Sequence, residues 1–497
     1  MSLGKQAAQG AAWNYAAFLV SKGLLFVATL ILARLLTPEE FGLVGMALLV
    51  ITVLEIFRDF GIGAALIYRQ GEEEREAAAN VAFWLSASIG IALFTLNWFL
   101  APVTVQFFKT GNPARAELMA TLLRVLGFSL LFASLGSTHD ALLQKEINYR
   151  RRMVPEVGRT LVKGTLSVVL ALIGWGVWSL VIGQVVGEGI ATILLWATSK
   201  WRPRRVLDRS LLRPMAGYGS QIMMSNGLGT MVADIDYFII ARLLGEAALG
   251  LYTLAFRIPE MIISNLSRAV SAVAFPVAAR LQADLPAMRE AYLRMQHYML
   301  LILAPLGFGL AAATPTIMHA LFQARWDPAI PVMQLLSVYM VLGAISHWPG
   351  VVYKAVGRPG ILNTLSFVKL SLLVPVLWTG AAIASIEGVA WGQVIVQSVG
   401  IAIDMVVIAR FVNISVTSNL RAIWPPFGAA IVMALAMWAV MMLDSTLTSI
   451  PVLALAVMVG AVTYLGMVWL LDRRAVRGLV TLGTGVFRRR ASVMRET

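Results

Sequence analysis

The stretch ILARLLTPEEFG, residues 31–42, is nearly repeated as IIARLLGEAALG at residues 239–250. The two copies align without a gap at an offset of 208 residues, so that Arg34 matches Arg242. In each copy an apolar run ends in Arg-Leu-Leu, and a second apolar run starts near a glycine. This repetition predicts a duplicated architecture in which each half contributes a matching helix end.

The composition predicts a protein that crosses a membrane many times. Of the 497 residues, 59% are hydrophobic and 13% are charged, whereas soluble domains carry about 25% charged residues. Apolar stretches of roughly 20 residues, long enough to span the hydrocarbon core of a bilayer, recur along the chain. Since a single lipid-exposed segment satisfies its backbone polar groups only as a helix, we expect an all-α integral membrane protein. The chain has no cysteine, which excludes disulfides, iron–sulfur clusters and thiol catalysis.

The apolar runs divide into about fourteen predicted transmembrane helices. The first is counted as a span because it is too long for the hydrophobic core of a signal peptide. Several exceed 25 residues and are expected to tilt or to extend beyond the bilayer. The predicted spans are 11–33, 41–67, 77–101, 118–143, 154–174, 177–198, 214–240, 247–278, 292–314, 329–353, 361–384, 388–409, 422–443 and 451–471.

The loop charges predict the orientation. If the N-terminus and every second loop share one side, that side carries nearly all the Lys and Arg residues of the loops and the tail. The positive-inside rule then places both termini in the cytoplasm. This topology, together with contact with anionic lipids, explains most of the net charge of +14. We therefore expect no nucleic-acid partner. The other side carries only Arg34, Lys109, Arg115, Arg242 and Arg325.

Further landmarks recur at a similar offset. The tripeptide Gly-Gln-Val at 183–185 returns at 392–394, and Lys163 and Lys369 stand 206 residues apart. Each predicted half has six spans, an even number, so both copies start on the same side of the membrane. The halves are therefore expected to be parallel repeats related by an axis along the membrane normal.

The repeat predicts four regions. They are an N-terminal six-helix lobe at 1–200, a C-terminal six-helix lobe at 201–410, two unpaired helices at 411–472 and a basic cytoplasmic tail at 473–497. Paired lobes are typical of transporters that hold a substrate between the lobes and rock one against the other. A duplicated scaffold that transports nothing is the alternative.

Charged residues inside the predicted spans are the candidates for function. A lipid-facing charge at mid-depth costs about 2.5–3.5 kcal/mol on insertion scales. Sixteen of these residues facing lipid would together cost roughly 40 kcal/mol, several times the ~5–15 kcal/mol stability of a typical fold. Most of them must therefore face water, protein or a partner. Local ion pairs such as Glu55–Arg58 and Arg257–Glu260 are the structural explanation to weigh against a functional one.

The spacing of these charges is helical. Glu55, Arg58 and Asp59 share one helix face, and so do Glu156, Arg159 and Lys163. Lys22 and Lys369 have no acid within one helical turn of them. Unpaired cations within the membrane favour an anionic substrate, such as a pyrophosphate or an acidic sugar. The predicted substrate-binding residues are Lys22, Arg58, Arg159, Lys163, Arg257, Arg268 and Lys369.

Intramembrane acids are the candidates for coupling transport to a proton or a sodium ion. They are Glu55, Asp59, Asp234, Asp236 and Glu260. The four histidines do not cluster with acids at ligand spacing, and neither a catalytic triad nor a phosphate-binding loop is present. We therefore expect no catalytic residues, no metal site and no cofactor.

Three segments resemble a known family. LARLLTPEEFGLVGMALLV (32–50) and RDFGIGAALIYR (58–69) resemble the first two helices of the polysaccharide transporter family. LGLYTLAFRIPEMIISNLSRAVSAVAFP (249–276) resembles its eighth helix. That family, which includes the flippases for O-antigen and exopolysaccharide repeat units, belongs to the multidrug/oligosaccharidyl-lipid/polysaccharide flippase superfamily.

The resemblance implies a flippase of the bacterial inner membrane that works by alternating access. Its substrate would be an anionic oligosaccharide repeat unit linked to undecaprenyl pyrophosphate, and its other partners membrane lipids, a polymerase and export machinery. A cationic central cavity is also implied. The rival functions are a drug or small-molecule exporter of the same superfamily, a non-transporting scaffold, and a glycan polymerase or glycosyltransferase. A polymerase or glycosyltransferase would need a large extracytoplasmic loop or a soluble catalytic domain. The longest predicted extracytoplasmic loop, near 102–117, is too short for either.

Overall fold

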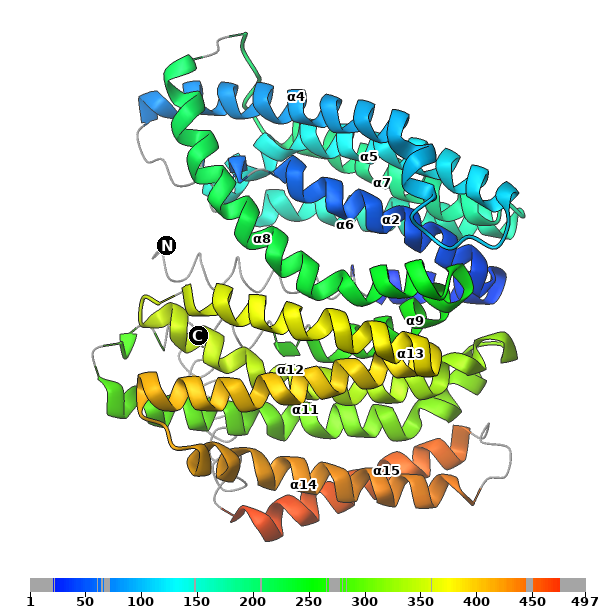
Figure 1. The fold of residues 1–497 in the computed structure, drawn as a ribbon, viewed down its shortest axis with the longest axis vertical. Coiled ribbons are helices and arrows are strands. Elements are labelled where there is room, and N and C mark those ends of the chain that lie inside the picture. Colours follow the sequence, from blue (N-terminus) through cyan, green and yellow to red (C-terminus); the bar gives the residue numbers. More distant parts are fainter. Residues whose placement is uncertain are drawn as a thin grey trace, which may run out of the picture. The chain divides into compact units, whose positions relative to one another are not determined.

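The computed structural model describes residues 21–473, apart from 22, 60, 64–65, 67–71, 147–148, 206–207, 265, 268–277, 279, 283, 359 and 444–449. Within that part of the chain the regular secondary structure consists of helices joined by loops (Figure 1). An apolar helix, Gly23–Leu35, precedes the labelled helices. These are α2 Pro38–Asp59, α4 Glu72–Val105, α5 Pro113–Lys145, α6 Tyr149–Leu172, α7 Val177–Thr198, α8 Arg209–Leu243, α9 Glu246–Pro259, α11 Leu285–Leu321, α12 Ile330–Ala355, α13 Gly360–Val412, α14 Val416–Met441 and α15 Ile450–Leu471.

The predicted fold class is confirmed: the chain is an all-α integral membrane protein. Each of the fourteen predicted spans overlaps a helical segment, and α13 covers two of them. Within the described ranges, nine helical segments are long and apolar enough by themselves to cross a membrane.

The packing separates the chain into two compact units. The first is Met1–Thr253 with Ala381–Ile386, and the second is Leu254–Gly380 with Glu387–Thr497. Helix α8 belongs to the first unit because it packs against α2 and α4. The division into lobes at residue 200, which follows from the sequence repeat, stays a prediction.

The duplicated motif has a direct structural role inside the first unit. Gly42 of α2 lies against the backbone of Glu246, and Gly250 of α9 lies against the backbone of Pro38. A Cβ atom at either glycine would overlap a carbonyl oxygen of the other helix. Pro38 and Glu246 are 208 residues apart, as are Gly42 and Gly250, so the contact is reciprocal. The two copies of the motif therefore pack against each other within the chain.

Local interactions fix the ends of these two helices. Thr37 and Glu40 form a capping box, with the Thr37 N–H 2.8 Å from Glu40 Oε2 and the Glu40 N–H 3.3 Å from Thr37 Oγ1. The loop after α4 and the first turn of α5 contact the other copy. Lys109 Nζ donates to the Leu243 carbonyl at 3.3 Å, and Arg115 pairs with the buried Glu246 carboxylate. The start of α9 is thus held in place by a third chain segment.

A second repeated feature is a tight turn between consecutive helices. Gly176, before α7, has φ 50° and ψ −129°. Ser385, which interrupts α13, has φ 54° and ψ −140° and lies 209 residues later. Only glycine adopts this region without strain. The turn therefore has the same conformation in both copies, although the second has a serine at this position.

Helices α14 and α15, the predicted thirteenth and fourteenth spans, pack within the second unit. Tyr464 Oη donates to the Leu301 carbonyl of α11 at 2.8 Å, and His297 Nε2 lies 3.1 Å from Asp472 Oδ2. Their buried side chains join those of α11 and α12 in one hydrophobic core.

Candidate functional site

A cavity of about 750 Å³ lies within the first unit. Helices α2, α5, α6 and α7 line it, together with Ser21 and Leu25 from the segment before α2. Its walls carry four cations and four acids from the membrane-spanning helices. The charged lining residues are Arg58, Asp59, Asp140, Arg152, Glu156, Arg159, Lys163 and Glu188.

Helix α6 supplies half of these charges. Arg152, Glu156, Arg159 and Lys163 follow one another at intervals of four, three and four residues, which places them on one face of the helix. That face borders the cavity. Glu156, Arg159 and Lys163, which the sequence places on one helix face, therefore all line this cavity.

Glycines on α7 allow that helix to pack closely against the charged face of α6. A Cβ at Gly187 would lie 3.1 Å from the Arg159 carbonyl oxygen and 3.0 Å from Lys163 Cβ, and Gly183 is similarly close to Ser167 and the Lys163 backbone. The sequence Gly183–Gly189 is thus used for close helix packing. As a consequence Glu188, next to Gly187, comes within reach of Arg159.

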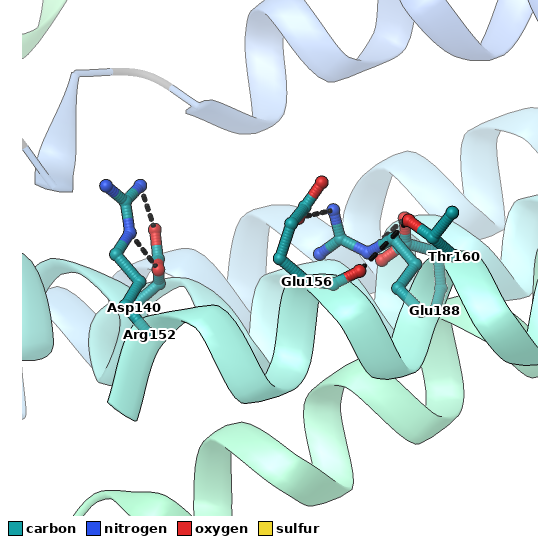
Figure 2. A network of polar contacts seen from close by, with 6 residues as sticks. Asp140, Arg152, Glu156, Thr160 and Glu188 are labelled. Atoms are coloured by element: carbon teal, nitrogen blue, oxygen red, sulfur yellow. Dashed lines mark hydrogen bonds and ion pairs between the residues drawn. The ribbon is translucent and has the colours of Figure 1, made fainter. Parts of the chain in front are cut away.

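Arg159 lies between two carboxylates. Its Nη1 is 3.2 Å from Glu156 Oε2 on the same helix, and its Nε is 3.2 Å from Glu188 Oε1 on α7 (Figure 2). The contact with Glu188 is an ion pair rather than a well-directed hydrogen bond, because the Nε–H has no acceptor in line with it. Glu188 is almost fully buried, at 9% exposure, whereas the Arg159 side chain is 36% exposed.

A second ion pair lies along the same row of charges. Arg152 donates to both carboxylate oxygens of Asp140 on α5, at 2.7 Å from Nε and 3.0 Å from Nη2 (Figure 2). Such a bidentate arrangement is the strongest geometry for an arginine–carboxylate pair. It joins α5 to α6 at one end of the charged row.

Helix α2 contributes the remaining charged residues. Arg58 and Asp59 line the cavity. Glu55, one turn earlier, is near enough to feel the charges of Arg58, Arg159, Lys163 and Glu188. Arg58 Nε is buried, and it has no hydrogen-bond partner among the residues that the structure describes. Arg159 Nε is likewise buried without a directed hydrogen bond, but Arg159, like Arg152, forms an ion pair with a neighbouring acid.

The structure brings together five of the predicted site residues. Glu55, Arg58, Asp59, Arg159 and Lys163 lie at or beside one cavity. Acids balance the cations of this cavity in number. The cationic central cavity that the resemblance implies stays a prediction. Sequence reasoning did not assign Asp140, Arg152, Glu156 or Glu188 to the site. Asp140, Glu156 and Glu188 lie inside the predicted spans 118–143, 154–174 and 177–198. Nothing in the sequence indicates that Asp140 pairs with Arg152.

The other predicted residues lie elsewhere. Lys369 Nζ donates to Gln397 Oε1 at 2.6 Å in the second unit. Arg257 is half-buried near the end of α9, and the exposed Glu260 starts a short π-helical segment, Glu260–Ser264. The two form no ion pair with each other, so the local pairing considered for them is absent. Lys22 and Arg268 lie outside the described residues.

The two acids of α8 differ from those of the cavity. Asp236 is fully buried, and its carboxylate accepts from the Tyr252 hydroxyl at 2.8 Å and the Tyr237 N–H at 2.9 Å. It therefore ties α8 to α9. Asp234, two residues earlier, is half-buried, and neither acid lines the cavity.

The helical arrangement and the charged cavity define an integral membrane protein with charged residues gathered among its helices. The model of a family described as polysaccharide biosynthesis protein matches residues 31–331. The chain therefore belongs to this family.

Curated relatives carry related names. The chain is 28% identical over 429 residues to the teichuronic acid biosynthesis protein TuaB of Bacillus subtilis, covering 86% of this chain and 87% of that one. It is 25% identical over 432 residues to the lipopolysaccharide biosynthesis protein WzxC of Escherichia coli, covering 86% of each. It is 29% identical over 335 residues to the succinoglycan biosynthesis transport protein ExoT of Rhizobium meliloti, covering 67% and 66%.

Solved structures share the fold. The lipid II flippase MurJ in an inward closed conformation superposes with a TM-score of 0.75 at 13% identity, covering 94% of this chain and 100% of that one. An inward-facing multidrug resistance transporter of the MATE family gives a TM-score of 0.65 at 16% identity, covering 79% and 94%. At these identities the likeness concerns the fold alone.

Proposed function

We propose that this protein is a flippase of the bacterial inner membrane. Its substrate is an oligosaccharide repeat unit linked to undecaprenyl pyrophosphate, which it moves from the cytoplasmic to the outer leaflet by alternating access. Membership of the polysaccharide biosynthesis protein family and the names of the relatives support the substrate class. Both termini are cytoplasmic in this proposal, and a polymerase and export machinery use the flipped product.

The cavity of the first unit carries the proposal. A lipid-linked diphosphate needs cations within the membrane, and arginine binds phosphate oxygens in the bidentate geometry that its planar guanidinium offers. Arg58 has a buried Nε with no hydrogen-bond partner among the described residues, and it lies on the cavity wall. We infer that Arg58 is the first cation to bind the diphosphate.

The paired arginine nearby supports a second step. Arg159 contacts Glu156 and Glu188 at the same distance of 3.2 Å, and it also lines the cavity. A diphosphate at Arg58 competes with these carboxylates for Arg159, so binding exchanges one set of ion pairs for another. Because Glu188 is nearly buried and pairs with Arg159 in this structure, the exchange has a cost that the new phosphate contacts must offset.

The remaining assignments extend the same proposal. Lys163 contributes to the phosphate site, and Lys22, Arg257, Arg268 and Lys369 bind the anionic substrate during its passage. Glu55 and Asp59 flank Arg58 on α2, so a proton or a sodium ion bound there competes electrostatically with the cation. Asp234, Asp236 and Glu260 are the other carriers to test for ion coupling.

An exporter of drugs or other small molecules is the second candidate function. The fold is shared with a multidrug resistance transporter, and fold alone does not distinguish the two. A cavity with four acids as well as four cations would also accept a cationic drug. Drug efflux from cells that express the protein, without any effect on glycan export, would favour this function.

The test compares two intramembrane arginines of the same unit. Arg58→Ala removes the cation on the cavity wall. Arg124→Ala is the matched control, because Arg124 stacks over Trp98 at 5.8 Å and does not line the cavity. Glycan export per molecule of membrane-inserted protein should fall at least about tenfold in Arg58→Ala, as expected for the loss of a charge-assisted hydrogen bond of about 1.5–3 kcal/mol. Equal export in both variants would exclude Arg58 as a substrate ligand.

A further inference from the structure

A second cavity lies within the second unit and has a different chemical character. Its volume is about 490 Å³, within the ~300–1,000 Å³ usual for ligand pockets. Helices α11, α12 and α14 line it together with the part of α13 that follows the interruption at Ser385. Most of the wall is apolar, with Phe308, Leu335 and Leu435 as representatives.

One charged residue belongs to this wall. Glu387 lies two residues after Ser385, at the start of the second helical part of α13, and its side chain is exposed. Trp391 follows one helical turn later on the same face, and Trp438 faces the cavity from α14. Both indoles are about half exposed, at 54% and 52%. A carboxylate and two open aromatic faces therefore stand at one apolar cavity.

The position along the helices indicates the depth in the membrane. The turn at Ala384 and Ser385 joins two predicted spans, so Glu387 lies at a helix end and not at mid-depth. Tryptophans concentrate at the level of the lipid headgroups, where one edge is apolar and the other wet. The topology predicted from the loop charges places this turn on the extracytoplasmic side. The cavity thus extends from the outer headgroup level into the apolar region.

The charge of the wall decides which ligand fits. A carboxylate repels a lipid-linked diphosphate, so this cavity is electrostatically opposite to what that headgroup needs. A ligand with an apolar chain and a cationic head complements both parts of the wall. The carboxylate would bind the cation directly, and indole faces within about 6 Å would add cation–π attraction.

We propose that this cavity binds a membrane phospholipid with an ethanolamine headgroup. The primary ammonium donates a hydrogen bond to the Glu387 carboxylate and lies between Trp391 and Trp438, and an acyl chain fills the apolar wall. A primary ammonium is favoured over a trimethylammonium because it has N–H donors for the carboxylate. The site lies in the second unit, apart from the charged cavity of the first, and does not depend on the function proposed above.

The test measures lipid binding to the purified full-length protein by native mass spectrometry. The probes are dioleoyl lipids with ethanolamine, choline and glycerol headgroups at equal concentration. The ethanolamine lipid should bind more tightly than the other two. Glu387→Gln should weaken its binding about tenfold, the effect of losing one charge-assisted hydrogen bond, and should leave the glycerol lipid unchanged.

Two further variants make the result specific. Glu117→Gln removes an exposed acid of the first unit and should change nothing. Leu435→Trp places a bulky ring in the cavity at a side chain that is 59% exposed, so the fold is retained while the excess binding of the ethanolamine lipid is lost. Equal binding of the three lipids to the wild type, or unchanged ethanolamine binding in Glu387→Gln, would overturn the proposal.

Discussion

The reciprocal contact between the two copies of the motif makes a sharp prediction about single methyl groups. Alanine at Gly42 or at Gly250 places a Cβ on the carbonyl oxygen of Glu246 or of Pro38, respectively. Each obstacle is backbone in the first turn of a helix, so it cannot rotate away as a side chain could. The two helices must therefore move apart, and the fold loses the close contact.

The magnitude follows from two opposing effects. Overpacking of a tight contact costs about 1–3 kcal/mol, and a backbone obstacle favours the upper half of that range. Alanine in place of a helical glycine returns about 0.5–1 kcal/mol through propensity. The net loss is about 1–2.5 kcal/mol for each substitution. In the double variant the total should be smaller than the sum, because helices already separated by one methyl group accommodate the second more easily.

The assay is thermal unfolding of the purified protein in detergent. A loss of this size lowers the midpoint by about 2–10 °C for a unit of roughly 250 residues. Gly45→Ala is the matched control on the same helix, because its Cβ would meet the flexible Leu249 side chain at 3.3 Å, and its midpoint should stay unchanged or rise. A Gly42→Ala protein as stable as the wild type, or fully additive losses in the double variant, would refute the reciprocal contact.

Three other outcomes follow from the account. Ser385→Gly should raise the free energy of unfolding by about 1 kcal/mol, because it relieves a backbone conformation that only glycine tolerates, and a midpoint at or below that of the wild type would contradict this. Reporter fusions after Gly111 and Arg325 should report the outside and a fusion after Arg358 the inside, and a reversed reporter would contradict the fourteen-helix topology. Lys22→Ala should lower glycan export without lowering the amount of protein in the membrane, whereas loss of the protein itself would assign Lys22 a structural role.

The sequence predicted those features that depend on local periodicity. Apolar runs located the spans because only a continuous apolar helix crosses lipid, and spacings of three and four residues placed Glu156, Arg159 and Lys163 on one face. The predicted spans 118–143 and 154–174 leave Arg152 in the loop between them, but α6 starts before it at Tyr149. A helix that extends beyond the bilayer can include charged residues in its outer turns. The hydropathy of the sequence therefore does not locate the end of the helix.

The pairings across helices could not be predicted in the same way. Arg159 meets Glu188 because Gly183 and Gly187 let α7 approach α6, and Arg152 meets Asp140 because α5 and α6 are adjacent. Both pairs depend on tertiary packing, which the spacing of residues along one helix does not predict. The offset of 208 residues likewise indicated a duplication, but not that the two copies contact each other.

The transport of a lipid-linked glycan by the purified protein tests the central claim most directly. The protein is reconstituted into liposomes with a fluorescent oligosaccharide on undecaprenyl pyrophosphate in one leaflet, and a membrane-impermeant quencher reports its arrival in the other. We predict that the wild type and Arg124→Ala move the lipid and that Arg58→Ala moves it at least about tenfold more slowly. A wild-type rate equal to that of protein-free liposomes would contradict the proposed function.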